Sequence, residues 1–256
     1  MNVAQMKQKV SESEWQTRVD LAACYRLVAH YGWTDLIFTH LSARVPDSVG
    51  SAEGEAFLIN PLGFLFNEIT ASSLVKVDLD GKILSETDYQ INPAGFTIHS
   101  AVHRARPNVG CVMHLHTDDG VAVSSQADGL LPLTQTAMTI VPNLAYHDYE
   151  GIALNHDERE RLVAHLGDSN VMVLRNHGTL TCGENVSSAF LNMYLLERAC
   201  SMQVRALSGS AKLNMPSTKA IETVANQISN TNLSLSELAW PALLRMLDSQ
   251  DPSYRD

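Results

Sequence analysis

The tightest constraint in this sequence is a pair of histidines one residue apart, His114 and His116, near the end of an apolar stretch from Val109 to Thr117. An extended strand places alternate side chains on the same face, so both imidazoles should share a face with Val112. Neutral imidazole is the commonest nitrogen ligand of zinc and of its neighbours in the first transition row. The pair therefore predicts two-thirds of a metal site. Two strand histidines hydrogen-bonded in a core are the alternative.

The composition is that of an ordinary globular protein with an excess of acidic residues. A chain of 256 residues is long enough to bury a sizeable core. Hydrophobic residues make up 45% of it and charged residues 18%, as in typical globular proteins. Asp and Glu outnumber Lys and Arg by 28 to 18, giving a net charge of −10. An acidic chain without a basic run argues against binding to nucleic acid or to an anionic membrane.

The four cysteines predict a reducing compartment. No two of them form a CxxC pair, and most have apolar neighbours, where a cysteine behaves as a small hydrophobe. The N-terminal residues are polar, and no segment has the apolar length that spans a bilayer. We therefore expect a cytoplasmic protein with no membrane partner.

Hydrophobic periodicity predicts helices and strands that alternate along the chain. Helices are expected over residues 14–31, 92–105, 118–126, 156–166 and 185–207. Strands are expected over 36–45, 56–59, 109–117 and 171–175, with a hairpin over 75–84, a loop at 146–148 and a break at 176–178. Neither GxGxxG nor GxxxxGK[ST] occurs, which argues against dinucleotide-binding and P-loop folds.

The sequence also predicts a division into a main domain and a tail. The main domain is expected over residues 14–208 and ends near a Ser-Gly-Ser stretch. A helical C-terminal extension over 209–256 contains two amphipathic segments joined by polar residues. These segments could dock on the core or reach a neighbouring subunit.

A third histidine extends the metal hypothesis through a family resemblance. His114-Leu-His116 is followed about sixty residues later by Asn176-His177-Gly178 and by the segment 183–190. Other motifs occur in the same order, at residues 32–37, 67–73, 94–99 and 146–151. Together these motifs resemble the class II aldolase/adducin family over roughly residues 14–207. Periodicity alone does not connect His177 with the other two.

The resemblance implies a metal site, a fold and an assembly. In that family the matching histidines, here His114, His116 and His177, bind one divalent metal, usually zinc, with Mn²⁺, Fe²⁺ or Co²⁺ as alternatives. Three protein ligands with an open position suit Lewis-acid catalysis on a carbonyl. The family fold is α/β, a three-layer α/β/α single domain with a mostly antiparallel central sheet. It commonly assembles as a four-fold tetramer with active sites at subunit interfaces.

One departure from the family pattern bears on the chemistry. Sugar-phosphate aldolases place a glutamate, the general acid/base, at the start of the helix that ends in an Arg-Pro motif, here Arg106-Pro107. This chain reads Asn92-Pro-Ala-Gly95 at that place, without an acid and without the Ser-Ser pair that helps hold a phosphate. At a second phosphate-binding loop the family has Thr-Gly. This chain reads Leu62-Gly63 there and keeps only the glycine. These details are closer to the adducin head domain, which is regarded as non-catalytic.

Two further histidines are candidates for the missing acid/base. His99 follows the Ala-Gly-Phe-Thr-Ile segment and either points toward the metal cavity or is a buried, structurally paired histidine. His40 lies in a segment that contributes to the substrate pocket in the family, where it either bonds a substrate oxygen or has a structural role at a strand end. His103, four residues after His99, is expected to face solvent. Glu197 is also expected on a solvent-facing side of its helix.

Two functions remain open at this level. The first is a metal-dependent lyase that cleaves or decarboxylates a small oxygenated substrate through a metal-stabilised enolate. Its acid/base would come from His99, His40, a bound water or the substrate. The second is a non-catalytic adducin-like assembly or binding module that retains the metal site. In both cases we expect a homo-oligomer, with a tetramer favoured.

Overall fold

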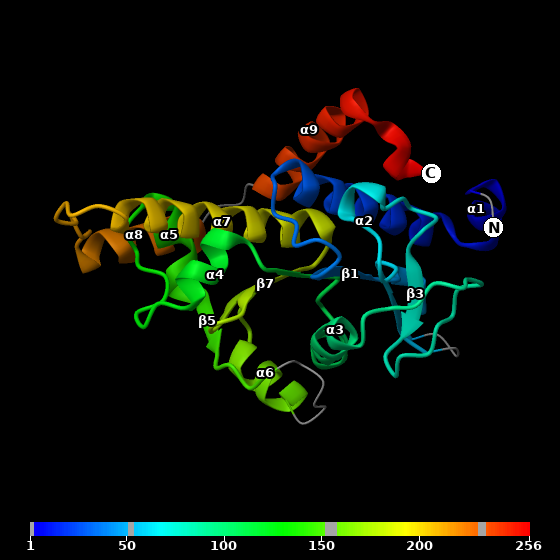
Figure 1. The fold of residues 1–256 in the computed structure, drawn as a ribbon, viewed down its shortest axis with the longest axis horizontal. Helices are drawn as coiled ribbons and strands as arrows, with labels where there is room; N and C mark the ends of the chain where they lie inside the picture. Colours follow the sequence, from blue (N-terminus) through cyan, green and yellow to red (C-terminus); the bar gives the residue numbers. More distant parts are fainter. Residues whose placement is uncertain (1–2, 51–53, 152–157, 230–233) are drawn as a thin grey trace.

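A sheet built around the histidine strand organises the computed structural model, which describes residues 3–50, 54–151, 158–229 and 234–256 (Figure 1). In these residues the strand order is β3-β2-β1-β4-β7-β6-β5. Neighbouring strands are antiparallel except for the parallel pair β5–β6. The strands are β1 (His40–Arg44), β2 (Ala56–Ile59), β3 (Val75–Asp78), β4 (Cys111–Leu115), β5 (Leu144–His147), β6 (Val171–Leu174) and β7 (Gly178–Gly183).

Helices cover both faces of the sheet, which confirms the three-layer α/β fold. In Figure 1, α2 and α7 lie on one side of the strands, and α3 and α6 lie on the other. The helices are α1 (Val3–Lys9), α2 (Glu12–His30), α3 (Pro93–Ala105), α4 (Asp118–Ser124), α5 (Gln135–Ile140), α6 (Glu158–Leu166), α7 (Val186–Leu207), α8 (Thr218–Ser229) and α9 (Leu235–Gln250).

The alternation predicted for β4 is what joins the two layers. Cys111, Met113 and Leu115 are buried in the core cluster that also contains residues of α2 and α7. Val112 is buried in a second cluster with residues of α3 and α6. His114 therefore faces α3, on the side that the sequence predicted.

Side-chain caps start the helices that frame the site. Asn92 accepts a hydrogen bond from the Ala94 backbone N–H and is followed by Pro93, so α3 begins with its first turn against β1. Thr117 caps α4 by accepting from the Gly120 N–H. Because Thr117 directly follows His116, the chain turns away from the sheet immediately after the second histidine.

Most predicted helices and strands are found within a few residues of their expected bounds. The hairpin over 75–84 is short, with β3 followed by one isolated bridge between Val77 and Ile83. Residues 146–147, expected in a loop, lie in β5, which is held by parallel pairing with β6. No strand is predicted at β7, whose Gly- and Thr-rich sequence becomes a strand through pairing with β4 and β6. Residues 156–157 of one expected helix lie outside the described residues.

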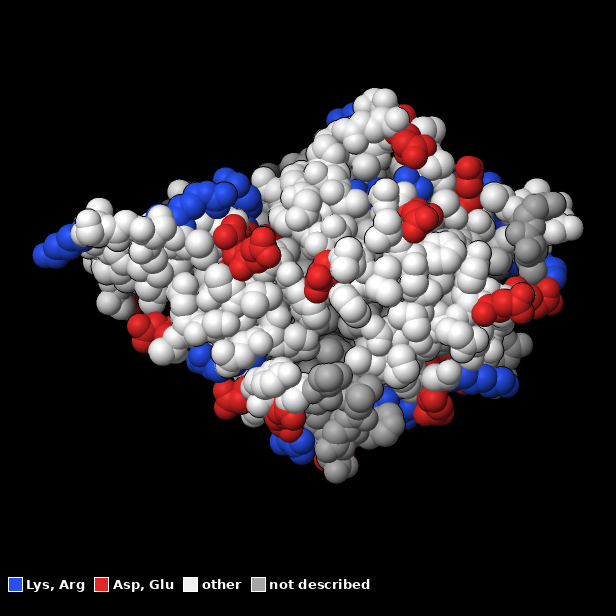
Figure 2. Space-filling model, in the orientation of Figure 1, with Lys and Arg blue, Asp and Glu red and all other residues white. Residues whose placement is uncertain are grey.

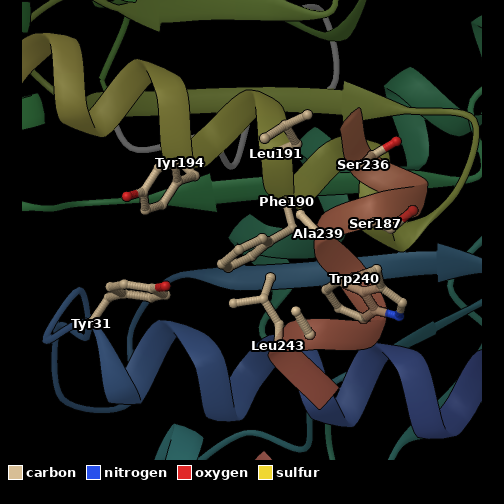
Figure 3. Close-up of a pocket in the computed structure, with 10 residues that line it drawn as sticks. Tyr31, Ser187, Phe190, Leu191, Tyr194, Ser236, Ala239, Trp240 and Leu243 are labelled. Atoms are coloured by element: carbon tan, nitrogen blue, oxygen red, sulfur yellow. The ribbon is translucent and has the colours of Figure 1, made fainter. Parts of the chain in front are cut away.

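The C-terminal extension docks on the core. Trp240 of α9 donates a hydrogen bond to Asp20 of α2 (3.0 Å), and Leu247 and Tyr254 are buried in the same core cluster as α2. Figure 3 shows Tyr31, which follows α2, and Phe190 of α7 on the same side as α9. These residues line an apolar cavity whose volume is about 280 Å³. The domain boundary near residue 208 stays a prediction.

Charged side chains are dispersed on the face shown in Figure 2, where acidic and basic groups lie among uncharged ones. The four cysteines, Cys24, Cys111, Cys182 and Cys200, are free and buried. In the described parts of the chain, every helix is too short or too polar to cross a lipid bilayer.

A buried tyrosine fixes the start of β1 next to the histidine strand. The Tyr25 hydroxyl lies 2.6 Å from the Leu41 carbonyl oxygen and accepts from the Leu41 N–H at 2.8 Å. It also lies 2.9 Å from Asn60 Oδ1, at the end of β2. Tyr25 is completely buried, so these backbone groups have no access to water as a substitute partner.

We expect Tyr25→Phe to lower the free energy of unfolding by about 1–3 kcal/mol, because it leaves buried polar groups of Leu41 and Asn60 unpaired. Urea unfolding followed by circular dichroism measures the loss. Tyr89→Phe is the control, since Tyr89 is 40% exposed, and should change stability little. Equal stability of Tyr25→Phe and the unaltered protein would contradict the argument.

Candidate metal centre

Three imidazoles from two separated stretches of chain meet at one end of the sheet. His114 belongs to β4, His116 lies just beyond the strand, and His177 lies in the turn before β7. The ring centroids are 4.7 Å (His114–His116), 4.7 Å (His114–His177) and 4.8 Å (His116–His177) apart. One potential ligand nitrogen of each ring lies within 4.8 Å of the others. The structure thus brings together the three residues predicted as metal ligands.

Hydrogen bonds orient two of the rings toward a common point. His114 Nδ1 donates to the Thr179 carbonyl oxygen at 3.0 Å, and His116 Nδ1 donates to Asp35 Oδ2 at 3.0 Å. The two Nε2 atoms are then the free acceptors, and they lie 2.9 Å apart. A backbone carbonyl or a carboxylate behind each imidazole is the usual arrangement around protein-bound metals, because it fixes the tautomer and the ring direction. Sequence reasoning missed Asp35.

The backbone geometry of the turn before β7 explains the Asn176-His177-Gly178 sequence. Asn176 adopts a left-handed backbone (φ +57°), which Asn tolerates better than most residues. A Cβ on Gly178 would lie 2.4 Å from the Leu115 carbonyl oxygen, so only glycine allows β7 to begin this close to the end of β4. The register pairs Leu115 with Thr179, which leaves His177 beside His116.

The donor set fits a divalent first-row metal. Zinc binds imidazole nitrogen at about 2.0–2.1 Å, so tetrahedral ligands lie roughly 3.3 Å from one another. Small side-chain adjustments would bring the three nitrogens to that spacing. Burial lowers the pKa of His177 to about 4 and lowers that of His114 well below its usual value. The rings of His114 and His177 are therefore neutral at pH 7, the state that binds a metal.

His40 and His99 lie next to this triad in a row of buried histidines. His40 is directly paired with His114 across β1 and β4, and their ring centroids are 5.6 Å apart. The His99 ring packs edge-on against His40 at 5.3 Å, and its Nδ1 lies 2.5 Å from Ser42 Oγ. His103 Nε2 lies 2.8 Å from the same hydroxyl. Sequence reasoning missed Ser42.

Two of the expectations about exposure are wrong. His103 is completely buried, because α3 turns this side toward β1 and Ser42 rather than toward solvent. Glu197 is 2% exposed, because α7 packs over the end of β7 and its carboxylate is enclosed there. Helical spacing alone does not reveal which charged position faces the sheet.

Gly95 leaves the room that His40 occupies. A Cβ built on Gly95 would lie 2.4 Å from His40 Cδ2 and 2.6 Å from both Cγ and Nε2. No side chain at position 95 can therefore coexist with His40 in this orientation. The absence of an acidic side chain at position 95 of α3 is therefore what allows His40 of β1 to take this orientation.

Comparison with known proteins decides the family. Residues 19–204 match the model of the Class II Aldolase and Adducin N-terminal domain. The chain belongs to the class II aldolase/adducin family. A Pseudomonas aeruginosa protein, provisionally named an aldolase class 2 protein, is 55% identical over 256 residues, covering 98% of this chain and 96% of the relative.

The proteins similar to this chain include both adducins and an aldolase. Alpha-adducin of Mus musculus is 41% identical over 250 residues, which cover 91% of this chain and 33% of alpha-adducin. The solved L-fuculose 1-phosphate aldolase of Glaciozyma antarctica superposes with a TM-score of 0.80 at 25% identity, covering 96% of this chain and 93% of that one.

We expect the purified protein to bind about one zinc ion per chain and His116→Ala to lose it, since two imidazoles bind far more weakly than three. Asp35→Asn should weaken binding by about 10–100-fold, because His116 loses its orienting carboxylate. Elemental analysis and competition with a chromogenic chelator measure both effects. The exposed His30, changed to Ala, is the control. Unaltered zinc content in His116→Ala would contradict the site.

The buried histidines predict acid sensitivity of the metal-free protein. Burial lowers the pKa of His99 and of His103 to about 3, against 6.5 for an ordinary histidine. The unfolded chain therefore binds more protons below pH 6.5, and stability present above that pH is lost as the pH falls toward 3. Each group contributes up to about 1.4 kcal/mol per pH unit. The free energy of unfolding, measured in urea at several pH values, should fall less steeply with decreasing pH in His103→Gln than in the unaltered protein. An equal pH dependence in the two proteins would contradict this assignment.

Proposed function

We propose that this protein is a metal-dependent lyase that breaks a carbon–carbon bond of a small oxygenated substrate, by aldol cleavage or decarboxylation through an enolate. The observation that carries the proposal is the convergence of His114, His116 and His177 with orienting partners behind two of them. A divalent cation, with zinc favoured, would supply Lewis acidity that polarises a carbonyl and stabilises an oxyanion. The family membership supports the same chemistry.

His40 is the residue that we assign to proton transfer. Its Nε2 lies where a side chain at position 95 would begin, which is the place of the glutamate in sugar-phosphate aldolases. Burial lowers its pKa well below 6.5, so the ring is neutral at pH 7. In an aldol cleavage Nε2 would accept the proton of the substrate hydroxyl as the bond breaks and return it to the enolate carbon.

His99 has a supporting part in this proposal. Its ring contacts His40, which in turn contacts His114, so His99 lies one ring farther from the triad, and its Nδ1 is bonded to Ser42. His99 Nε2 and His40 Nδ1 are both buried without a hydrogen-bond partner. A shared water or a small ring rotation would connect them and fix the tautomer of His40.

The substrate that we propose lacks a phosphate. Pro93 and Ala94 occupy the start of α3 where a hydroxyl pair would hold a phosphate, and Leu62 is exposed at the second loop. None of these side chains donates a hydrogen bond. Short hydroxyketones and hydroxy- or oxo-acids therefore fit the proposal better than sugar phosphates.

A non-catalytic adducin-like module is the second candidate. The 41% identity with alpha-adducin and the glycine at position 95 favour it. In this reading the histidines stabilise the fold, and no substrate reacts. We also propose a homotetramer, by analogy with the family, and a cytoplasmic location from the free, buried cysteines.

Deuterium exchange at carbon next to a carbonyl tests the proposal without knowledge of the full substrate. The zinc-loaded protein should exchange this proton in at least one member of a panel of hydroxyketones and oxo-acids, followed by NMR. His40→Gln should slow exchange by about 10²–10⁴-fold with unchanged zinc content, because the general base is lost. Gly95→Ala should also slow it, since the added Cβ displaces His40.

His30→Gln, at an exposed position, is the matched control and should keep full activity. Metal-dependent exchange that His40→Gln leaves unaltered would contradict the role of His40. A zinc-loaded protein that neither exchanges nor cleaves any member of the panel would favour the non-catalytic module.

A further inference from the structure

A buried carboxylate lies behind the metal centre on the opposite side of the sheet from His40. Glu197 of α7 accepts a hydrogen bond from Thr179 Oγ1 at 2.9 Å and another from Thr117 Oγ1. Thr117 directly follows His116 in sequence. Thr179 supplies the carbonyl oxygen that orients His114. One side chain therefore ties together the two chain segments that set the positions of His114 and His116.

The site is shaped around this carboxylate. A Cβ on Gly120 would lie 2.6 Å from Thr117 Oγ1 and 3.0 Å from Glu197 Oε1, so glycine leaves the required space. The hydroxyl of Thr117 donates to Glu197 and accepts from the Gly120 N–H at 3.1 Å. The hydroxyl proton of Thr117 and one of its lone pairs are thus engaged, and the carboxylate has little freedom to move.

The negative charge of Glu197 has no cationic partner of its own. Among the described residues, no Lys or Arg forms an ion pair with it, and Arg205, which lines the same pocket, pairs with Asp119. Burial raises the pKa of Glu197 to about 7, and the nearby Asp119 adds to this shift. An isolated buried carboxylate is costly unless a positive charge offsets it.

We propose that Glu197 is a positioning residue for the metal centre, whose charge offsets that of the divalent cation and whose two threonine bonds hold the ligand-bearing segments in place. Three neutral imidazoles leave both positive charges of a bound cation without a counter-charge among the ligands. Asp35, which bonds to His116, has a solvent-exposed side chain, whereas Glu197 is buried. Glu197 lies behind Thr117 and Thr179 and acts through them. The inference rests on the proposed metal site and adds the residue that tunes its affinity.

Glu197→Gln removes the negative charge of the side chain but keeps its size and its hydrogen-bonding capacity. The amide oxygen can accept from one threonine, and the amide nitrogen can donate to the other. Thr179 Oγ1 can then turn its proton to the Leu115 carbonyl oxygen, which lies 3.5 Å away. The variant should therefore fold, and Glu184→Gln, which removes one exposed charge from the same chain, is the matched control.

Two measurements at about pH 8 test the proposal. Competition with a chromogenic chelator should show a zinc dissociation constant about tenfold or more higher in Glu197→Gln than in the unaltered protein, with no such change in Glu184→Gln. Thermal unfolding without metal should show Glu197→Gln at least as stable as the unaltered protein, because an uncompensated buried charge is gone. With zinc, the variant should gain less stability.

The outcomes distinguish this inference from the proposed function. Unaltered protein that binds no zinc overturns both. Equal zinc affinity of Glu197→Gln and the unaltered protein overturns only the role of Glu197. A purely structural glutamate would lower the melting temperature equally with and without zinc, and that result, or failure of the metal-free variant to fold, also overturns it.

Discussion

The antiparallel pairing of β4 with its two neighbours is the interaction on which the rest of the structure depends. Pairing with β1 places His40 directly opposite His114, and pairing with β7 places Thr179 opposite Leu115. Because a shift of one residue would turn each side chain to the other face, the register decides whether these groups meet at all. The close start of β7, which requires Gly178, then delivers the third imidazole.

Burial gives the site its chemical character. Imidazoles enclosed between the sheet and α3 stay neutral at pH 7, so they are ligands and proton acceptors rather than cations. The row from His114 through His40 to His99 ends in Ser42 and shares one face of the sheet. Two carboxylates supply the negative charge that the imidazoles lack: Asp35 bonds to His116, and Glu197 lies on the other face of the sheet. A cation held between these two environments would have neutral ligands on one side and an anionic counter-charge behind them.

Local pattern predicts much of this protein, and non-local pairing explains what it misses. The alternation of the strand around His114 and the stop signals of α3 are visible in sequence because they arise within a few neighbouring residues. The strand β7 is not visible, because glycines stand at both of its ends and weaken the strand preference of its threonines, so that pairing with β4 and β6 decides it. The burial of His103 and Glu197 is also hidden, because helical spacing gives a face but not the element that will cover it. Asp35 becomes a partner of His116 only through the fold.

The sequence by itself determined the two-histidine strand, the Asn-His-Gly turn and the absence of an acid at position 95, because these are properties of residue identity and spacing. Only the tertiary structure decided that His177 joins the pair, that His40 fills the space above Gly95 and that Glu197 stands behind the site. The physical reason is that these contacts join residues 18 to 80 positions apart, and their geometry is set by strand register and helix packing rather than by any local preference.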